Sequence, residues 1–269
     1  IRDRNLTVAA SDAKRISEED SVKLVTSMSP KIEYVSMNQK EKPFDNALVR
    51  QAINYAIDRK SLNTVATAGY GEVTDSVMNK QISGYTDDVA HYDYNPEKAK
   101  ELLKQAGYEN GFETTILVSG DTRNTEAQLI QANLAEVGIN VTINTAESTA
   151  MLEQINNGGY KMFIMSYNNT TGDPDTSLYM LFNSKVPASS GNRSFTNIPE
   201  VDQKLEAARV ETNADARMKI YAELQKTLTE QAVWVPLYCV PNLVGIRGDL
   251  SGYTPHPLGN DVFDQLSYE

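Results

Sequence analysis

The chain has 269 residues, enough for one large domain or two smaller ones, and its 40% hydrophobic content is typical of a globular protein. No run approaches the roughly 20 apolar residues that a membrane-spanning helix needs. The 36 acidic residues outnumber the 25 basic ones, and the net charge of −11 argues against nucleic acid or an anionic membrane as the main partner. Because Cys239 is the one cysteine, no intrachain disulfide or thiolate metal cluster can form.

Apolar periodicity and end signals predict an alternation of strands and helices. The clearest helix has Asn95 as N-cap, Pro96 at its first position and Gly107 as C-cap. In chain order the pattern predicts a strand at residues 32–37, helices at 47–59 and 96–107, a strand at 114–118, a helix at 125–137, a strand at 140–145, a helix at 149–157, a strand at 162–166, helices at 201–211 and 214–229, and strands at 233–238 and 243–246.

The middle of the chain indicates an α/β fold. From residue 114 to 166 the order is strand, helix, strand, helix, strand, which predicts one α/β layer. Residues 2–30 and 247–269 fit this layer poorly, and we expect them to be arms that need a partner surface. The apolar sides of the predicted elements give the expected core residues Ile53, Ile57, Leu103, Ile130, Leu134 and Ile164.

Catalytic signatures are weak. His91 and His256 are the only histidines, and both lie in turn-like segments typical of surface residues. No serine elbow, phosphate loop, dinucleotide fingerprint or calcium or zinc loop is found, so the sequence predicts no enzyme, cofactor or metal site. A hydrolase that uses Asp173 and Asp175 is the enzymatic alternative, although two carboxylates in one turn are better explained as helix caps.

Two loops that follow predicted strands carry side chains suited to ligand binding. Ligands of open α/β sheets collect beyond the carboxyl ends of strands, so Tyr167, Asn168, Asn169 and Thr170 would face a crevice. An ordinary turn is the alternative, because Gly172, Asp173 and Pro174 are turn formers. In the second loop, from Ser119 to Asn124, Arg123 could hold a carboxylate with two hydrogen bonds or could simply be exposed to solvent.

Three segments carry a resemblance to a known family. Residues 34–38 (Tyr-Val-Ser-Met-Asn), 42–45 (Lys-Pro-Phe-Asp) and 49–59 (Val-Arg-Gln-Ala-Ile-Asn-Tyr-Ala-Ile-Asp-Arg) closely resemble the family 5 solute-binding proteins of ABC importers, the oligopeptide, dipeptide and nickel-binding class. Weaker matches follow in the family's order, at residues 69–71, 94–103, 134–138, 172–176 and 235–238. We expect the charges of Arg50, Asp58 and Arg59 to be structural and not ligand-binding, because these side chains can pair on the flank of the predicted helix.

The resemblance implies the C-terminal lobe of a type II-like periplasmic binding protein, a mixed sheet flanked by helices. Residues 1–30 would be a remnant of the first lobe or a linker, residues 31–238 the second lobe bounded by two hinge crossings, and residues 239–269 an arm that returns to the first lobe. The implied function is extracytoplasmic capture of a peptide-like solute, in the periplasm or as a lipid-anchored protein, and its delivery to an ABC permease. A metal chelate or other small solute and a sensory module on the same fold remain alternatives.

The resemblance also guides the expected binding residues. In peptide-binding members an aspartate that holds the peptide amino terminus aligns with Thr170, and an arginine that holds the peptide carboxylate aligns near Asn124. Tyr34 and Asn38 would lie at the first crossing. The complete set of candidate ligand-binding residues is Tyr34, Asn38, Ser119, Arg123, Asn124, Tyr167, Asn168, Asn169, Thr170 and Asp173.

Overall fold

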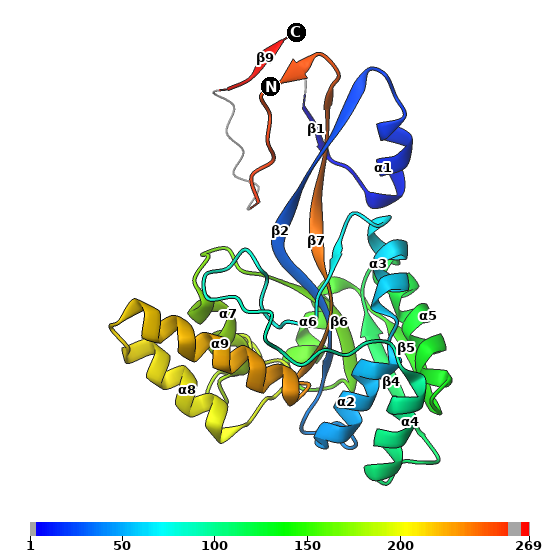
Figure 1. Ribbon diagram of the computed structural model, residues 1–269. Coiled ribbons are helices and arrows are strands. Elements are labelled where there is room, and N and C mark those ends of the chain that lie inside the picture. The colour runs from blue at the N-terminus through cyan, green and yellow to red at the C-terminus, as the bar shows by residue number, and fades with distance from the viewer. Residues whose placement is uncertain (1–3, 258–264, 269) are drawn as a thin grey trace.

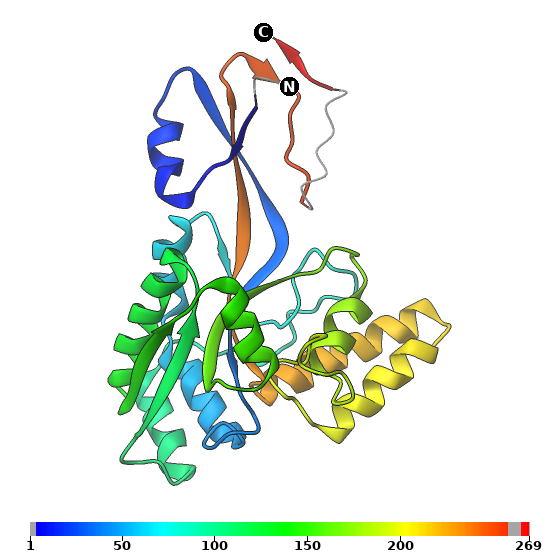
Figure 2. The ribbon, with the colours of Figure 1, turned by 180° about the vertical axis from the view of Figure 1, so that it is seen from behind.

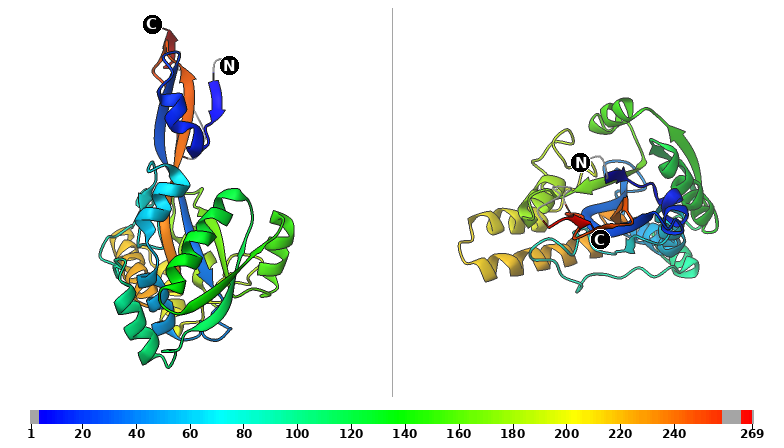
Figure 3. Two further views of the ribbon diagram at one scale, coloured as in Figure 1. Left: turned by 90° about the vertical axis from the view of Figure 1, so that its right-hand side faces the viewer. Right: turned by 90° about the horizontal axis from the view of Figure 1, so that it is seen from above.

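The computed structural model describes residues 4–257 and 265–268. A large α/β body carries a narrow upper part, and two long strands connect them (Figures 1 and 3). These strands, β2 (Val22–Met37) and β7 (Trp234–Arg247), pair with each other in antiparallel fashion from the body into the upper part. None of the helices in the described ranges is long and apolar enough to cross a bilayer.

The central sheet is mixed. Its order is β1-β7-β2-β6-β4-β5, with β3 (Glu72–Val73) paired to β7. β4 (Phe112–Val118) runs parallel to both β5 (Ile139–Thr145) and β6 (Met162–Asn168), whereas β2 is antiparallel to β6 and β7. The three strands predicted between residues 114 and 166 therefore lie in one sheet, which confirms the predicted α/β layer and the fold class.

Helices cover both faces of the sheet (Figures 1 and 2). Side chains alternate along each strand, so Val35 and Met37 of β2 pack into one core and Tyr34 into the other. Both faces of β6 are buried over its first three residues, which form a continuous apolar run, whereas β5 at the sheet edge alternates buried and exposed residues. The first core takes residues from α2 (Ala47–Ala56), α3 (Arg59–Thr67), α4 (Pro96–Gln105) and α5 (Asp121–Ala135); the second takes them from α6 (Ser148–Asn156), α7 (Pro174–Phe182), α8 (Pro199–Val210) and α9 (Ala214–Glu230).

All six predicted core residues are buried, which confirms their assignment to the apolar sides of their elements. Local end signals are confirmed as well. The Asn95 side chain accepts a hydrogen bond from the Lys98 backbone N–H at 3.0 Å, and Gly107 has the positive φ of +82° that glycine adopts without strain.

The helix predicted at residues 47–59 is two helices. α2 ends at Ala56, Ile57 is extended, and Asp58 caps α3 by accepting from the backbone of Lys60 and Ser61. The predicted pairing of charges on the helix flank is also wrong. Arg50 and Arg59 are each only 4% exposed, and both donate hydrogen bonds to backbone carbonyl groups instead.

The described parts of the two predicted arms contain strands that pair with other strands of the chain: β1 (Arg4–Thr7) and the first half of β2 with β7, and β8 (Leu250–Ser251) with β9 (Ser267–Tyr268). Residues 22–28 of β2 pair with residues 241–247 of β7. The strands predicted at 233–238 and 243–246 are parts of this one strand, β7. The register is irregular between Met28, which pairs with Pro241, and Ile32, which pairs with Cys239. The upper part also holds β1, α1 (Ala10–Ser17), β8 and β9.

Candidate solute-binding site

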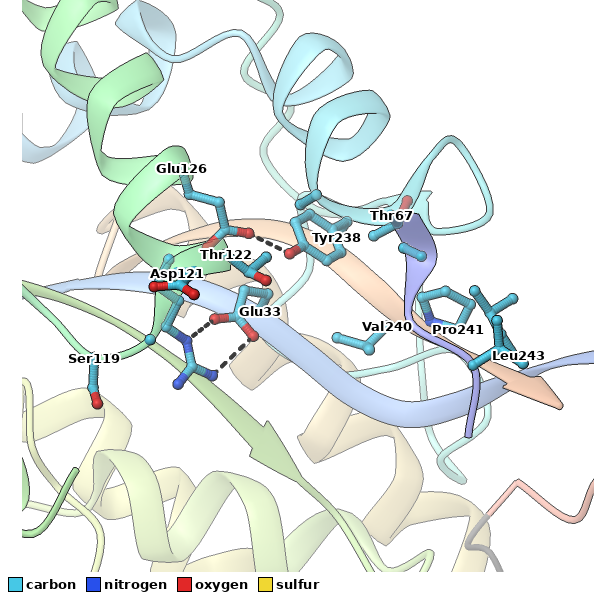
Figure 4. Close-up of a pocket in the computed structure, with 15 residues that line it drawn as sticks. Glu33, Thr67, Ser119, Asp121, Thr122, Glu126, Tyr238, Val240, Pro241 and Leu243 are labelled. Atoms are coloured by element: carbon cyan, nitrogen blue, oxygen red, sulfur yellow. Dashed lines mark hydrogen bonds and ion pairs between the residues drawn. The ribbon is translucent and has the colours of Figure 1, made fainter. Parts of the chain in front are cut away.

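A cavity of about 400 Å³ lies where the long strands meet the body (Figure 4). Its walls come from the loop after β4 and the first turns of α5, from β2 and β7, from the end of α3, and from the segment between β1 and α1. This is the carboxyl end of β4, where open α/β sheets bind ligands. Its size is within the range of small-molecule pockets.

An ion pair joins the first long strand to the start of α5. Arg123 Nε donates to Glu33 Oε1 at 2.5 Å, and Nη2 donates to Glu33 Oε2 at 3.3 Å and to Ser166 Oγ at 3.2 Å. Glu33 is 5% exposed. Burial by itself would lower the pKa of the Arg123 guanidinium, but the hydrogen bond and charge of Glu33 outweigh burial and raise this pKa. Arg123 therefore stays charged at the cavity wall.

A second contact joins α5 to the other long strand. The Tyr238 hydroxyl donates to Oε1 of Glu126, whose side chain has no exposed surface (Figure 4). No described residue pairs with Glu126 Oε2. A buried acceptor without a partner costs about 1–3 kcal/mol. Burial, and next the negative charge of Glu33, raise the pKa of Glu126 to about 7, while the Tyr238 hydrogen bond and Arg123 oppose that rise.

The raised pKa of Glu126 predicts a pH-dependent stability. Between pH 4.5, the ordinary pKa, and about pH 7, the folded chain keeps a proton on Glu126 that the unfolded chain has released. The contribution of this proton to the free energy of unfolding is therefore complete below pH 4.5 and is lost as the pH rises through about 7. Glu126→Gln keeps the neutral form. We expect it to raise the free energy of unfolding by roughly 2 kcal/mol at about pH 8 and by almost nothing at about pH 4. Urea titrations followed by Trp234 fluorescence measure this difference. A difference that does not change with pH would contradict the prediction.

Of the predicted binding residues, Ser119 and Arg123 line this cavity. Asn124, on the next position of α5, makes contacts within the body: Nδ2 donates to the Gly120 carbonyl at 3.1 Å, and Oδ1 accepts from the Thr145 hydroxyl at 2.8 Å. The structure thus brings together the strand end and the arginine that the sequence singled out.

Tyr34 and Asn38 are occupied in the interior. The Tyr34 ring stacks on the Trp234 ring with centroids 3.7 Å apart, and Tyr34 is 2% exposed. Asn38 Nδ2 donates to the Gly158 and Tyr160 carbonyl groups, each at 3.1 Å. Both side chains serve packing and loop anchoring because the second helical layer covers their face of the sheet.

The loop from Tyr167 to Asp173 is held mainly by its own side chains. The Tyr167 hydroxyl donates to the Thr176 carbonyl at 3.0 Å, and Asn169, 2% exposed, accepts from the backbone of Thr171 and Gly172. Asp173 caps α7 and forms an ion pair with Arg217 at 3.2 Å, so its carboxylate has a structural partner. Asn168 and Thr170 are exposed. These two remain candidates for contact with a ligand.

The three residues that form the buried polar contacts of the cavity wall with Arg123 and with one another were not predicted from the sequence: Glu33, Glu126 and Tyr238. A signal existed for two of them. Glu126 lies four residues before Ile130 and eight before Leu134, on the apolar stripe of its helix, and Glu33 lies on the same face of its strand as the core residues Val35 and Met37. A carboxylate at a core position is costly unless it is paired, so it marks a place worth examining. Tyr238 carried no such signal.

The described residues contain no group of three or more histidine, cysteine, aspartate or glutamate side chains that could hold a metal ion. The His91 ring, near the acidic residues that follow α3, has its Nδ1 3.0 Å from Asp75 Oδ2. Asp173 and Asp175 lie at the start of α7, where Asp175 pairs with Arg209 at 3.4 Å. These carboxylates thus serve the helix end and its ion pairs.

Comparison with known families decides what this fold is. Residues 3–189 match the model of bacterial extracellular solute-binding proteins, family 5. The chain belongs to this family. Membership confirms the resemblance drawn from residues 34–59 and places the chain among solute-binding proteins and not among enzymes.

Relatives that are named as binding proteins match almost the whole chain. Heme-binding protein A of Haemophilus influenzae is 31% identical over 96% of the chain and 48% of its own length, and the glutathione-binding protein GsiB of Salmonella choleraesuis is 34% identical over 94% and 51%. The structure of the periplasmic binding protein DppA from Helicobacter pylori, in complex with peptide STSA, superimposes with a TM-score of 0.88 at 29% identity, over 99% of this chain and 52% of that one. This family 5 chain therefore spans about half the length of the relatives it matches.

Proposed function

We propose that this family 5 chain forms the second lobe of a two-lobed solute-binding protein that captures a peptide-like solute outside the cytoplasm and passes it to the membrane subunits of an ABC permease. The observation that carries the proposal is the family match over residues 3–189. It is supported by relatives named for heme binding and glutathione binding and by one solved with a bound peptide, and the chain covers about half the length of each. The location would be the periplasm, or the cell surface if the protein is lipid-anchored.

The proposed lobe organisation follows the long strands. Residues 31–238 form the second lobe, residues 1–30 and 239–269 belong to the side of the first lobe, and β2 and β7 are the two crossings. Support comes from the antiparallel pairing of these strands and from their irregular register between Met28 and Ile32, at the proposed boundary (Figure 1). Both proposed boundaries lie within strands, so the crossings are continuous β structure.

The proposed mechanism is closure of the two lobes around the solute by bending at the crossings. Ser119 and Arg123 at the cavity, with the exposed Asn168 and Thr170 at the end of β6, are this lobe's proposed contacts to the ligand. Arg123 Nη2 donates to Ser166 near the end of β6, so the two groups lie on neighbouring strand ends. Closure would exclude water and strengthen these polar contacts.

Calorimetry with tripeptides and tetrapeptides tests the proposal. We expect the longer protein that contains this chain to bind members of the panel without hydrolysing them, and this chain alone to bind them at least about 100-fold more weakly. The reason is that tight pockets bury about 70–90% of a ligand, which one open lobe cannot do. Equal affinities would contradict the two-lobed organisation, and turnover of the peptides would contradict a pure binding function.

A further inference from the structure

The cavity between α5 and the long strands has an excess of negative groups. Its wall contains the carboxylates of Glu33, Asp121 and Glu126 and one cation, Arg123. Tyr238 is the other titratable group, and the remaining lining residues, including those from α3 and from the β1–α1 connection, carry none. With every carboxylate ionised, three negative charges face one positive charge, so the wall lacks cations.

The one cation is already engaged. Both oxygens of Glu33 accept from Arg123, and its Nη2 also reaches Ser166 Oγ. On the other side, the Tyr238 hydroxyl donates to Oε1 of Glu126 and leaves Oε2 without a donor in the described part of the chain. Figure 4 shows the Glu126 carboxylate pointing from α5 toward the Tyr238 hydroxyl group, with Glu33 on the neighbouring strand β2. When Glu126 is ionised, the missing partner of Oε2 is therefore a hydrogen-bond donor, and the charge balance calls for a positive one.

We infer that this cavity is a subsite for a positively charged nitrogen of the solute, an ammonium or guanidinium group that donates to the Glu126 carboxylate beside the Glu33–Arg123 pair. The inference rests on the proposed function, because it assigns one part of the ligand to one part of the proposed cleft. An anionic group is disfavoured because it would meet three carboxylates, and a neutral apolar group would leave Glu126 Oε2 without a donor.

The inferred subsite joins ligand binding to the hinge. Glu33 belongs to β2, Tyr238 to β7 and Glu126 to α5, so one cation would contact or neighbour all three elements. Reaching Oε2 requires a small movement of its surroundings, since Glu126 has no exposed surface in this structure. Movement of β2 and β7 relative to α5 would open that access. Binding of the cation also favours the ionised carboxylate, so it must displace a proton at low pH.

The test compares four peptides on the longer protein that contains this chain: Ala-Lys-Ala, Ala-norleucine-Ala and the amino-acetylated form of each. Norleucine keeps the lysine chain without the ammonium group, and acetylation removes the amino-terminal charge, so the panel separates a side-chain source from an amino-terminal source. Glu126→Gln removes the charge with little change of shape. Glu109→Gln makes the same substitution at an exposed position outside the cavity and serves as the matched control.

We expect either the lysine ammonium group or the free amino terminus to improve affinity at least tenfold over the matching neutral peptide in the wild type and in Glu109→Gln. In Glu126→Gln the same group should improve affinity less than about twofold. Affinity for acetyl-Ala-norleucine-Ala should be the same in all three proteins, which excludes a merely structural effect. The preference should grow from about pH 6 to pH 8 in the wild type and stay flat in Glu126→Gln.

Two results would overturn the inference. If the charged and neutral peptides bind the wild type equally, or if Glu126→Gln keeps the preference, the cavity does not hold the cation, while the proposed capture of peptides stands because the peptides still bind. If none of the four peptides binds the wild type at any pH, the proposed function fails and the inference fails with it.

Discussion

Replacing Arg59 with methionine should lower the free energy of unfolding by about 3–5 kcal/mol, because a buried charged network would lose its donor. Arg59 donates to the Pro236 carbonyl at 2.7 Å, to the Asn54 and Tyr92 carbonyls at 3.0 and 2.9 Å, and to Asn54 Oδ1 at 2.6 Å. Methionine keeps the length and apolar stem of arginine but donates nothing, so these acceptors would stay buried without their partner.

Arg59 also joins distant parts of the chain. It begins α3, and its acceptors lie in α2, in the segment before α4 and in β7, close to the base of the long strands. Asp75 Oδ1, 3.9 Å from Nε, adds a nearby carboxylate. Loss of this network should therefore loosen the attachment of α3 to β7 as well as lower the global stability.

Urea titration followed by the fluorescence of Trp234, the single tryptophan, measures the effect. Arg15→Met provides the control, since the Arg15 side chain is 64% exposed and pairs with the exposed carboxylates of Asp12 and Glu19. We expect the control to change stability by less than about 0.5 kcal/mol. A change below about 1 kcal/mol in Arg59→Met would mean that water or neighbouring donors replace the guanidinium.

Leu103→Ala should cost about 2–5 kcal/mol, because it leaves a cavity in the first core. Leu103 lies on the inner face of α4, is 1% exposed and belongs to the cluster formed with α2 and α5. The cost adds lost apolar burial to the lost contacts around the empty volume, and its size depends on how far the neighbouring side chains relax.

The same substitution at Leu152 is the control, because Leu152 on α6 is 38% exposed. We expect Leu152→Ala to cost under about 1 kcal/mol by the same urea titration. Similar costs at the two positions would show that the α4 face contributes little to the core that surrounds the sheet.

The sequence by itself determined the elements whose signals are local. Asn95 and Pro96 start α4 because a side-chain acceptor and a fixed φ act within one helical turn. The strands from residue 114 to 166 were predicted because their apolar and β-branched runs are local features of the sequence. The family followed from residues 34–59, and the family match confirms it.

Only the tertiary structure decided which polar side chains are free and which are occupied. Tyr34 was predicted to bind ligand, and in the structure Trp234, 200 residues later in the chain, stacks on it at 3.7 Å. Arg123 was predicted either to hold a carboxylate with two hydrogen bonds or to be exposed, and the carboxylate that it holds is that of Glu33, 90 residues before it in the chain. Pairing across such separations depends on which strands become neighbours, and periodicity within one element carries no information about that. The cavity of Glu33, Glu126 and Tyr238 exists only because β2, α5 and β7 meet there.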